Sequence, residues 1–125
     1  MISFEDFKPV AGTPIYLQIL TYVKRGCVAG SIVNGDELPS RRVLSALLGI
    51  NPNTVQKAFH LLEEEGLIES VSGSRSFMTF DDQKVEKLKT ELLTDDIRDI
   101  TTALKQMGFS KDEAVELIER YWEAD

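Results

Sequence analysis

The sequence predicts a mainly α-helical fold with one small β-hairpin, and two observations in the 125-residue chain support this prediction. Apolar residues recur every three or four positions in five segments, which is the period of helices with one buried face. Around residues 67–80, between the third and fourth segments, this period gives way to two short β-rich runs separated by a glycine-containing loop. A chain of this length suits one domain with a short appendage.

The first helix is predicted to begin at Thr13-Pro14 and to end at Gly30. Thr13 is a capping residue, and proline is favoured at the first helical position. Gly30 follows the last position of the apolar stripe, where glycine commonly ends a helix. Cys27 lies on that stripe, so we interpret it as a small buried thiol of the core.

Two shorter helices follow. Ser40 is expected to cap the second helix, which ends at Gly49, and Asn51 to cap the third, with Pro52 at its first position and Gly66 at its end. Their expected buried positions are Val43, Leu44, Leu47 and Leu48 in the second helix and Val55, Ala58, Phe59 and Leu62 in the third. Two helices joined by so short a link are typical of a helix-turn-helix, and a hairpin that follows one is a wing.

The last 45 residues are predicted to form two amphipathic helices. The first runs from Asp81 to Gly108, and a capping box of Ser110 and Glu113 opens the second. Two helices do not enclose a core of their own, so their apolar stripes must pack on the first domain or on a partner chain. Of these alternatives we favour the pairing of two copies of the chain. The residues assigned to this dimer contact are Leu88, Leu92, Ile97, Ile100, Leu104, Ile118, Tyr121 and Trp122. The predicted organisation is a winged helix-turn-helix domain at residues 1–80 and a two-helix dimerisation region at residues 81–125.

Composition excludes several classes of function. One Cys27 forms no intrachain disulfide, and with one His60 it does not supply the ligands of a zinc site. No nucleophile paired with a base and no glycine-rich phosphate loop is present, so we expect no enzyme activity, no metal and no cofactor. No stretch approaches the ~20 apolar residues that span a bilayer, and the acidic N-terminus lacks a signal-peptide pattern, so we expect a cytoplasmic protein without membrane contact.

The net charge of −7 conceals an uneven distribution of charge. Residues 1–80 carry 7 basic and 8 acidic side chains, whereas residues 81–125 carry 7 and 13. The stretch from Leu38 to Leu62 holds no acidic residue but includes Arg41, Arg42 and Lys57. A basic window of this kind is usually only a solvated face, and by itself it is weak support for nucleic-acid binding.

Three linked segments resemble the GntR family of bacterial transcription regulators. They read LPSRR at residues 38–42, LGINPNTVQKAF at residues 48–59 and LEEEGLI at residues 62–68. The run NPNTV and the short two-helix tail are similar to the YtrA subfamily in particular. The resemblance implies a homodimeric DNA-binding regulator, most often a repressor, that recognises a near-palindromic operator. Members of this subfamily tend to control operons for ABC-type transporters. The sequence shows no effector ligand.

The start of the third helix supplies the side chains that such a function needs. A recognition helix approaches the major groove with its N-terminal end, where short polar groups reach base edges and phosphates. The residues assigned here are Asn51, Pro52, Asn53, Thr54, Gln56 and Lys57. Asn53 and Gln56 are suited to bidentate pairing with adenine. The alternative is that Asn51 only caps the helix and the others are exposed without a function.

Two further groups are assigned to DNA. The free N–H groups at the start of the second helix attract a phosphate near Ser40. The resemblance implies a DNA contact for Arg42, and Arg41, which stands where the family most often has glutamate, is interpreted as a second phosphate contact or a surface salt bridge. In the wing, the resemblance implies contacts from Ser72, Gly73 and Arg75.

Departures from the family pattern bear on specificity. Many relatives carry arginine at the positions of Pro52 and Gln56, and its absence here indicates an operator rich in A·T pairs. In the wing, the family's Gly-Arg-Gly is replaced by Gly73-Ser74-Arg75, so the second glycine is lost and the charge moves by one position along the chain. Arg75 is still suited to enter a minor groove, because narrow A·T tracts attract arginine.

A second hypothesis treats the winged helix as a protein-interaction module without DNA binding. Such a surface would be expected to expose an apolar or aromatic anchor, whereas residues 51–57 present mostly small polar groups.

Overall fold

The structure is a computed structural model that describes residues 1–73 and 75–124. It divides into two compact units, Met1–Lys89 and Thr90–Asp125. The division falls inside helix α4 (Asp82–Gln106), whereas the sequence analysis placed the domain boundary after Phe80. None of the helices among the described residues combines the length and apolar character needed to cross a membrane.

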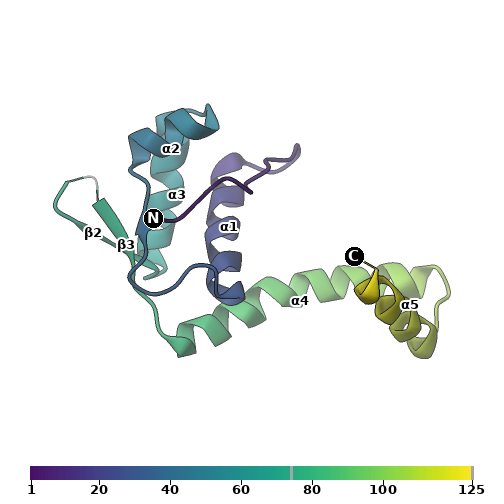
Figure 1. Ribbon diagram of the computed structural model, residues 1–125. Coiled ribbons are helices and arrows are strands. Elements are labelled where there is room, and N and C mark those ends of the chain that lie inside the picture. Colours follow the sequence, from purple (N-terminus) through teal and green to yellow (C-terminus); the bar gives the residue numbers. More distant parts are fainter. Residues whose placement is uncertain (74, 125) are drawn as a thin grey trace. The chain divides into compact units, whose positions relative to one another are not determined.

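The first unit is a helical domain with a small sheet (Figure 1). Its elements are α1 (Ile15–Ala29), β1 (Glu37–Leu38), α2 (Arg41–Leu48), α3 (Pro52–Glu64), β2 (Ile68–Val71), β3 (Arg75–Met78) and the beginning of α4. Helix α3 packs against both α1 and α2. The mainly α-helical winged helix-turn-helix expected from the sequence is therefore confirmed.

The wing hairpin, β2 and β3, supplies two strands of a three-stranded antiparallel sheet with the order β1-β3-β2. Ile68 pairs with Met78 and Val71 with Arg75, which closes the expected hairpin. The sequence analysis missed strand β1, in which Leu38 pairs with Ser76 of β3. Two residues are too few to show an alternating pattern, so only a distant pairing partner defines this strand.

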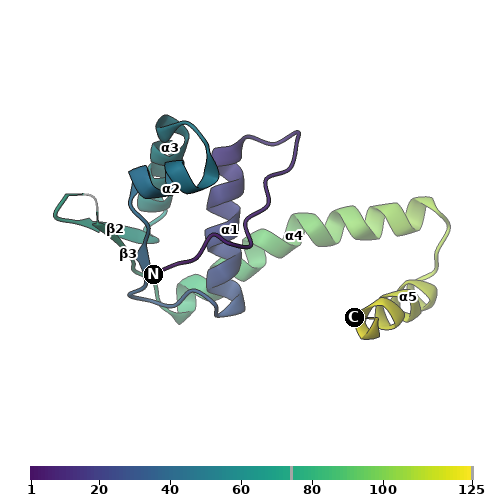
Figure 2. The same ribbon diagram turned by 45° about the horizontal axis from the view of Figure 1, so that its top comes forward.

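The core of the first unit lies between α1 and α3. Val55, Ala58, Phe59 and Leu62 of α3 have no exposed area, as the apolar stripe predicted. The chain before α1 crosses that helix (Figure 2), and its buried side chains complete the core. Phe4 stacks on Tyr22 with ring centroids 5.0 Å apart, and Phe7 meets the same ring edge-on.

Most helix ends follow the expected caps. The Ser40 hydroxyl accepts the Val43 N–H at 3.1 Å, and the side-chain carbonyl of Asn51 accepts the Asn53 N–H at 2.8 Å. The capping box of Ser110 and Glu113 is formed, and the hydrogen bonds from Ser110 hold the pKa of the Glu113 carboxyl below its ordinary value.

Two expectations about α1 and α2 are wrong. Helix α1 begins at Ile15 with Pro14 at the capping position, and Thr13 does not cap it. Instead, the Gln18 side chain holds the preceding turn, because its amide hydrogen-bonds to the backbone of Val10 and Thr13.

In α2, Val43 and Leu47 are 47% and 68% exposed, although both were expected to be buried. Of the four expected positions, the two-turn helix buries Leu44 and half-buries Leu48, and it also buries Ser45, next to Leu44.

The second unit contains the rest of α4 and helix α5 (Lys111–Glu123). None of the described α5 side chains is buried, and Leu88, the one buried residue of α4, belongs to the first unit. The exposed large apolar side chains of the second unit are Leu93, Ile97, Ile100, Met107, Phe109, Val115, Ile118, Tyr121 and Trp122. Helices are stabilised mainly by packing of their apolar face, and a large exposed apolar patch marks an interaction site. We therefore expect these side chains to pack against another surface.

Cys27 provides a test of the core. Burial, and to a lesser extent the carboxylate of Asp36, raises the pKa of its thiol from 9.0 to about 11. At pH 8 the thiolate fraction is therefore about a hundredfold lower than at the ordinary pKa. We expect a disulfide reagent to label the folded protein at least that much more slowly than the urea-unfolded protein, measured by absorbance. Equal rates would contradict a buried Cys27.

Candidate nucleic-acid interface

The outer face of α3 gathers the residues that the sequence analysis assigned to base recognition. Asn51, Pro52, Asn53, Gln56 and Lys57 are exposed, and Thr54 is half-buried. The opposite face of the same turns carries fully buried residues of the core. Because the inner face is fixed in the core, the polar face is fixed toward solvent.

Asn51 has a structural role in this arrangement. Its side-chain oxygen accepts the Asn53 N–H, and its backbone carbonyl accepts the Thr54 N–H at 2.9 Å. This capping orients the side-chain amide and occupies one lone pair of its oxygen, while both NH₂ donors are left for a ligand. Asn53 and Gln56 have no comparable bond among the described residues, and their amides keep both donors and acceptors.

The turn between α2 and α3 is held by a residue that the sequence analysis did not select. The hydroxyl of Ser45, a largely buried side chain, donates to the Ile50 carbonyl at 2.6 Å, and the Ile50 N–H returns a bond to the Ser45 carbonyl at 3.1 Å. Gly49 adopts the left-handed conformation that ends α2, with φ of 64°. These contacts set the angle at which α3 leaves α2.

Arg41 is bound within the protein. Its Nη2 lies 3.5 Å from Oε1 of Glu63, and its guanidinium lies 5.2 Å from the centroid of the Phe59 ring. Oε1 of Glu63 also accepts the Ser70 hydroxyl of β2 at 2.6 Å. Arg41 therefore joins α2 to α3 and, through Glu63, to the wing. Arg41 was interpreted either as a phosphate contact or as part of a surface salt bridge, and the structure favours the salt bridge, with Glu63 as the partner.

Arg42 differs from its neighbour, because its side chain is exposed and has no ion pair among residues 1–73 and 75–124. It lies in the first turn of α2 beside Ser40, whose hydroxyl accepts the Val43 N–H and leaves the backbone N–H groups of Arg41 and Arg42 for a ligand. This combination is suited to a phosphate. Lys57 projects from α3, and its Nζ lies 4.1 Å from the centroid of the Tyr16 ring of α1.

Arg75 of the wing is tied to β1. Its Nε lies 3.0 Å from Oε2 of Glu37, and its Nη2 lies 3.3 Å from Oε1 of the same carboxylate. The hydrogen bonds from Arg75 hold the pKa of Glu37 below its ordinary value. Ser72 and Gly73 form the adjoining turn with positive φ angles of 34° and 78°, and Ser74 lies outside the described residues.

The assigned dimer residues fall into two groups. Leu88 is 1% exposed and belongs to the core of the first unit, so its side chain has no surface left for a second chain. The others, Leu92, Ile97, Ile100, Leu104, Ile118, Tyr121 and Trp122, lie in the second unit and are exposed or half-buried. The buried position of Leu88 reflects contacts within its unit that helical periodicity does not distinguish from contacts with a partner.

The remaining titratable residues and cavities do not suggest catalysis. His60 is exposed and lies 3.0 Å from Glu64, one helical turn away. Within the described part of the chain, no three His, Cys, Asp or Glu side chains form a group that would hold a metal ion.

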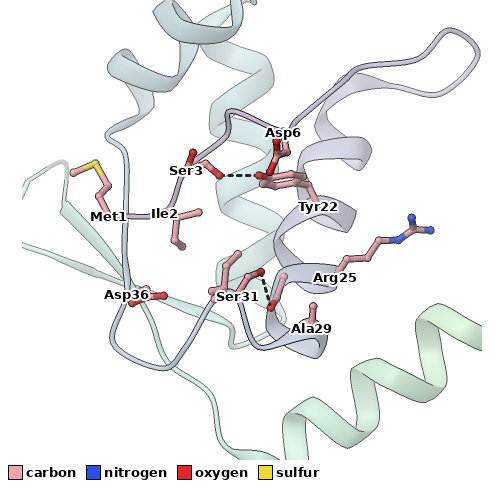
Figure 3. A pocket seen from close by; sticks show the side chains of 11 residues that line it. Met1, Ile2, Ser3, Asp6, Tyr22, Arg25, Ala29, Ser31 and Asp36 are labelled. Atoms are coloured by element: carbon pink, nitrogen blue, oxygen red, sulfur yellow. Dashed lines mark hydrogen bonds between the residues drawn. The ribbon is translucent and has the colours of Figure 1, made fainter. Parts of the chain in front are cut away.

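A hollow of about 500 Å³ lies between the N-terminal segment and α1 (Figure 3). The Tyr22 hydroxyl donates to the Ser3 carbonyl at its wall. None of the residues assigned to DNA lines this hollow.

The different surroundings of Arg41 and Arg42 predict different effects on stability. We expect Arg41→Ala to lower the free energy of unfolding by about 1 kcal/mol, because it removes an ion pair and a ring contact. Arg42→Ala should change it by less than about 0.5 kcal/mol. Urea unfolding followed by circular dichroism measures both. Equal effects of the two substitutions would contradict the structural role of Arg41.

Comparison with known proteins supports the interpretation of this geometry. The family model for bacterial regulatory proteins of the gntR family matches residues 15–78. The HTH-type transcriptional repressor YtrA of Bacillus subtilis (strain 168) is 39% identical over 99 residues, which cover 79% of this chain and 72% of that protein. Both names denote regulatory proteins, in agreement with the expectation that the chain is not an enzyme.

Solved structures give the same result. A GntR family transcriptional regulator from Listeria monocytogenes has a TM-score of 0.80 at 28% identity, covering 90% of this chain and 98% of that chain. The DNA-binding domain of AraR, solved in complex with operator ORX1, has a TM-score of 0.50 at 26% identity, covering 58% of this chain and 89% of that chain. These findings confirm the resemblance seen in the sequence motifs, including that to YtrA. The chain belongs to the GntR family of bacterial regulatory proteins.

Proposed function

We propose that the protein is a sequence-specific transcriptional repressor that binds a near-palindromic DNA operator as a homodimer. The observation that carries this proposal is the two-sided character of α3, whose first turns expose amide, hydroxyl and ammonium groups over a fully buried inner face. A helix held in this way within a helix-turn-helix presents its N-terminal end to the major groove.

Base recognition is assigned to Asn53 and Gln56. In bidentate pairing with adenine, the side-chain NH₂ donates to N7 while the side-chain oxygen accepts from the N6 amino group, for about 1–3 kcal/mol of discrimination. The outer face of α3 carries no arginine, the usual partner of guanine. The operator is therefore expected to contain A·T pairs at the bases that face α3.

Phosphate contacts are assigned to three sites in each chain. The start of α2 offers Arg42 together with unpaired backbone N–H groups beside Ser40. Lys57 on α3 and Arg75 in the wing supply two further cations. Ser72 and Gly73 support the wing turn. Backbone contacts of this kind fix the register of the protein on the duplex and carry no sequence information themselves.

Dimerisation is assigned to the second unit. Among its described residues, the second unit has no buried core of its own to receive its apolar side chains. Those that stay exposed include Ile97, Ile100, Ile118, Tyr121 and Trp122. Leu92 and Leu104 complete this set, and Leu88 is left out because it is buried in the first unit. A second copy offers the same surface, as a two-fold symmetric interface requires. Two recognition helices then enter successive major grooves about 34 Å apart.

The regulated genes are proposed from similarity alone. The relative named as the repressor YtrA supports repression over activation. We expect the operator to lie before an operon for an ABC-type transporter, and the protein to act in the bacterial cytoplasm, where the chromosome is. No effector ligand is assigned.

The second candidate function is a protein-interaction module without DNA binding. One observation favours it, since Val43 and Leu47 form an exposed apolar pair on α2. This pair lies in the same short helix as Arg42. Because the second function involves no DNA, a test of DNA binding separates the two functions.

Selection of fragmented genomic DNA at two salt concentrations tests the proposal. We expect the purified protein to enrich a short inverted repeat, and its affinity for that fragment to fall with a slope of log K against log[salt] of roughly −5, because three cations in each chain meet about six phosphates. A slope near zero, or no enrichment at either salt concentration, would favour the interaction module.

The dimer is tested by Ile118→Asp, with Glu119→Asp on the same helix as the matched control. Ile118 is exposed in the single chain, so its replacement leaves the fold of that chain intact. We expect the dimer dissociation constant, measured by sedimentation equilibrium, to rise tenfold or more, because an unpaired carboxylate enters an apolar contact. The control should leave it unchanged. A dimer that is insensitive to Ile118→Asp would contradict the assignment of this surface.

A further inference from the structure

Glu37 is an acidic residue beside the wing to which the DNA-binding function assigns no role. Glu37 lies in β1 and pairs in register with Phe77 of β3. Side chains alternate along a strand, so Arg75 and Phe77 of β3 share one face of the sheet. Glu37 reaches Arg75 on this face through the two hydrogen bonds described above.

The two bonds use one particular edge of the guanidinium group. They engage Nε and Nη2, so two of the five N–H donors are satisfied by the carboxylate. The guanidinium carbon also lies over the Phe77 ring, 5.0 Å from its centroid. The edge formed by Nη1 and the second proton of Nη2 remains open, and the Arg75 side chain is 61% exposed. Arg75 is thus held by Glu37 at one edge and rests against Phe77, while its outer edge stays available.

We propose that Glu37 is a positioning residue for DNA binding, which holds Arg75 so that the open edge of its guanidinium meets a DNA phosphate beside the wing. The proposal rests on the proposed function. An unrestrained arginine loses side-chain freedom when it binds, and a side chain already fixed loses less. A phosphate accepts two parallel N–H bonds from the open edge of a guanidinium. Glu37 itself does not contact the DNA.

The opposing effect of Glu37 is repulsion, because a carboxylate near DNA weakens binding to any sequence. The sheet contains a matched control for this effect. Glu69 of β2 pairs with Phe77 from the other side, and it has no ion pair among residues 1–73 and 75–124. Glu37→Gln and Glu69→Gln remove the same charge from either side of the same residue. Only Glu37→Gln weakens the hold on Arg75.

The test measures each variant on two DNA duplexes, the fragment enriched from genomic DNA and a random-sequence duplex of equal length. We expect Glu37→Gln to weaken binding to the enriched fragment by about three- to tenfold, the scale of ordering one long side chain in each subunit. Glu37→Gln should bind the random duplex slightly more strongly, because a repelling charge is removed. Glu69→Gln should bind both duplexes slightly more strongly for the same reason. In an Arg75→Ala background, Glu37→Gln and Glu69→Gln should have equal effects.

If Glu37 only stabilised the fold, Glu37→Gln would weaken binding to both duplexes. Weaker binding to the enriched fragment together with stronger binding to the random duplex therefore distinguishes a positioning role from a structural one. Stronger binding of Glu37→Gln to both duplexes would overturn the proposal and leave Glu37 as a repelling charge. An NMR measurement without DNA separates this outcome from failure of the proposed function. The Nε–H proton of Arg75 should exchange slowly with water in the unaltered protein and faster in Glu37→Gln. Slow exchange without selective binding of any fragment would overturn the DNA-binding function together with the role of Glu37 in it.

Discussion

The packing of α3 into the core of the first unit is the constraint on which the candidate interface depends. Val55, Ala58, Phe59 and Leu62 are completely enclosed, and a close-packed core does not allow this helix to rotate. A rotation by one residue, about 100°, would carry polar side chains into the core and expose Phe59. The outward direction of Asn53, Gln56 and Lys57 therefore follows from the burial of their neighbours.

Two arginines of the first unit are held by carboxylates of the same unit. Glu37 and Glu63 directly flank the stretch without acids at residues 38–62. Glu63 binds Arg41, which lies inside this stretch, and Glu37 binds Arg75 of the wing. The first pair connects α2 with α3, and the second connects β1 with the wing. Acidic residues at these positions therefore organise a basic surface in a chain whose net charge is negative.

The features that the sequence predicted well depend on short-range effects. The caps at Ser40, Asn51 and Ser110 involve residues two or three positions apart, and the inner face of α3 follows from its own periodicity. The hairpin was predicted because a change of period and a glycine-containing loop are also local signals. The assignment of bases and phosphates to particular residues remains a prediction.

The features that the sequence did not predict depend on residues that are distant along the chain. Strand β1 exists only through its pairing with β3, and Arg41 meets a glutamate on another helix. The same applies to Leu88, whose apolar character fits a core and a dimer contact equally well. Val43 and Leu47 were misplaced because a two-turn helix has too few apolar positions to define which side is buried.

The central claim is that the outer face of α3 recognises bases, and the most direct measurement replaces one of its amides. Gln56→Ala and the unaltered protein would each be used to select binding sites from a fully randomised duplex library. If Gln56 recognises a base, preference is lost at one base pair in each half-site and the other positions are unchanged. An identical motif for both proteins, with or without a change in overall affinity, would contradict this account of α3.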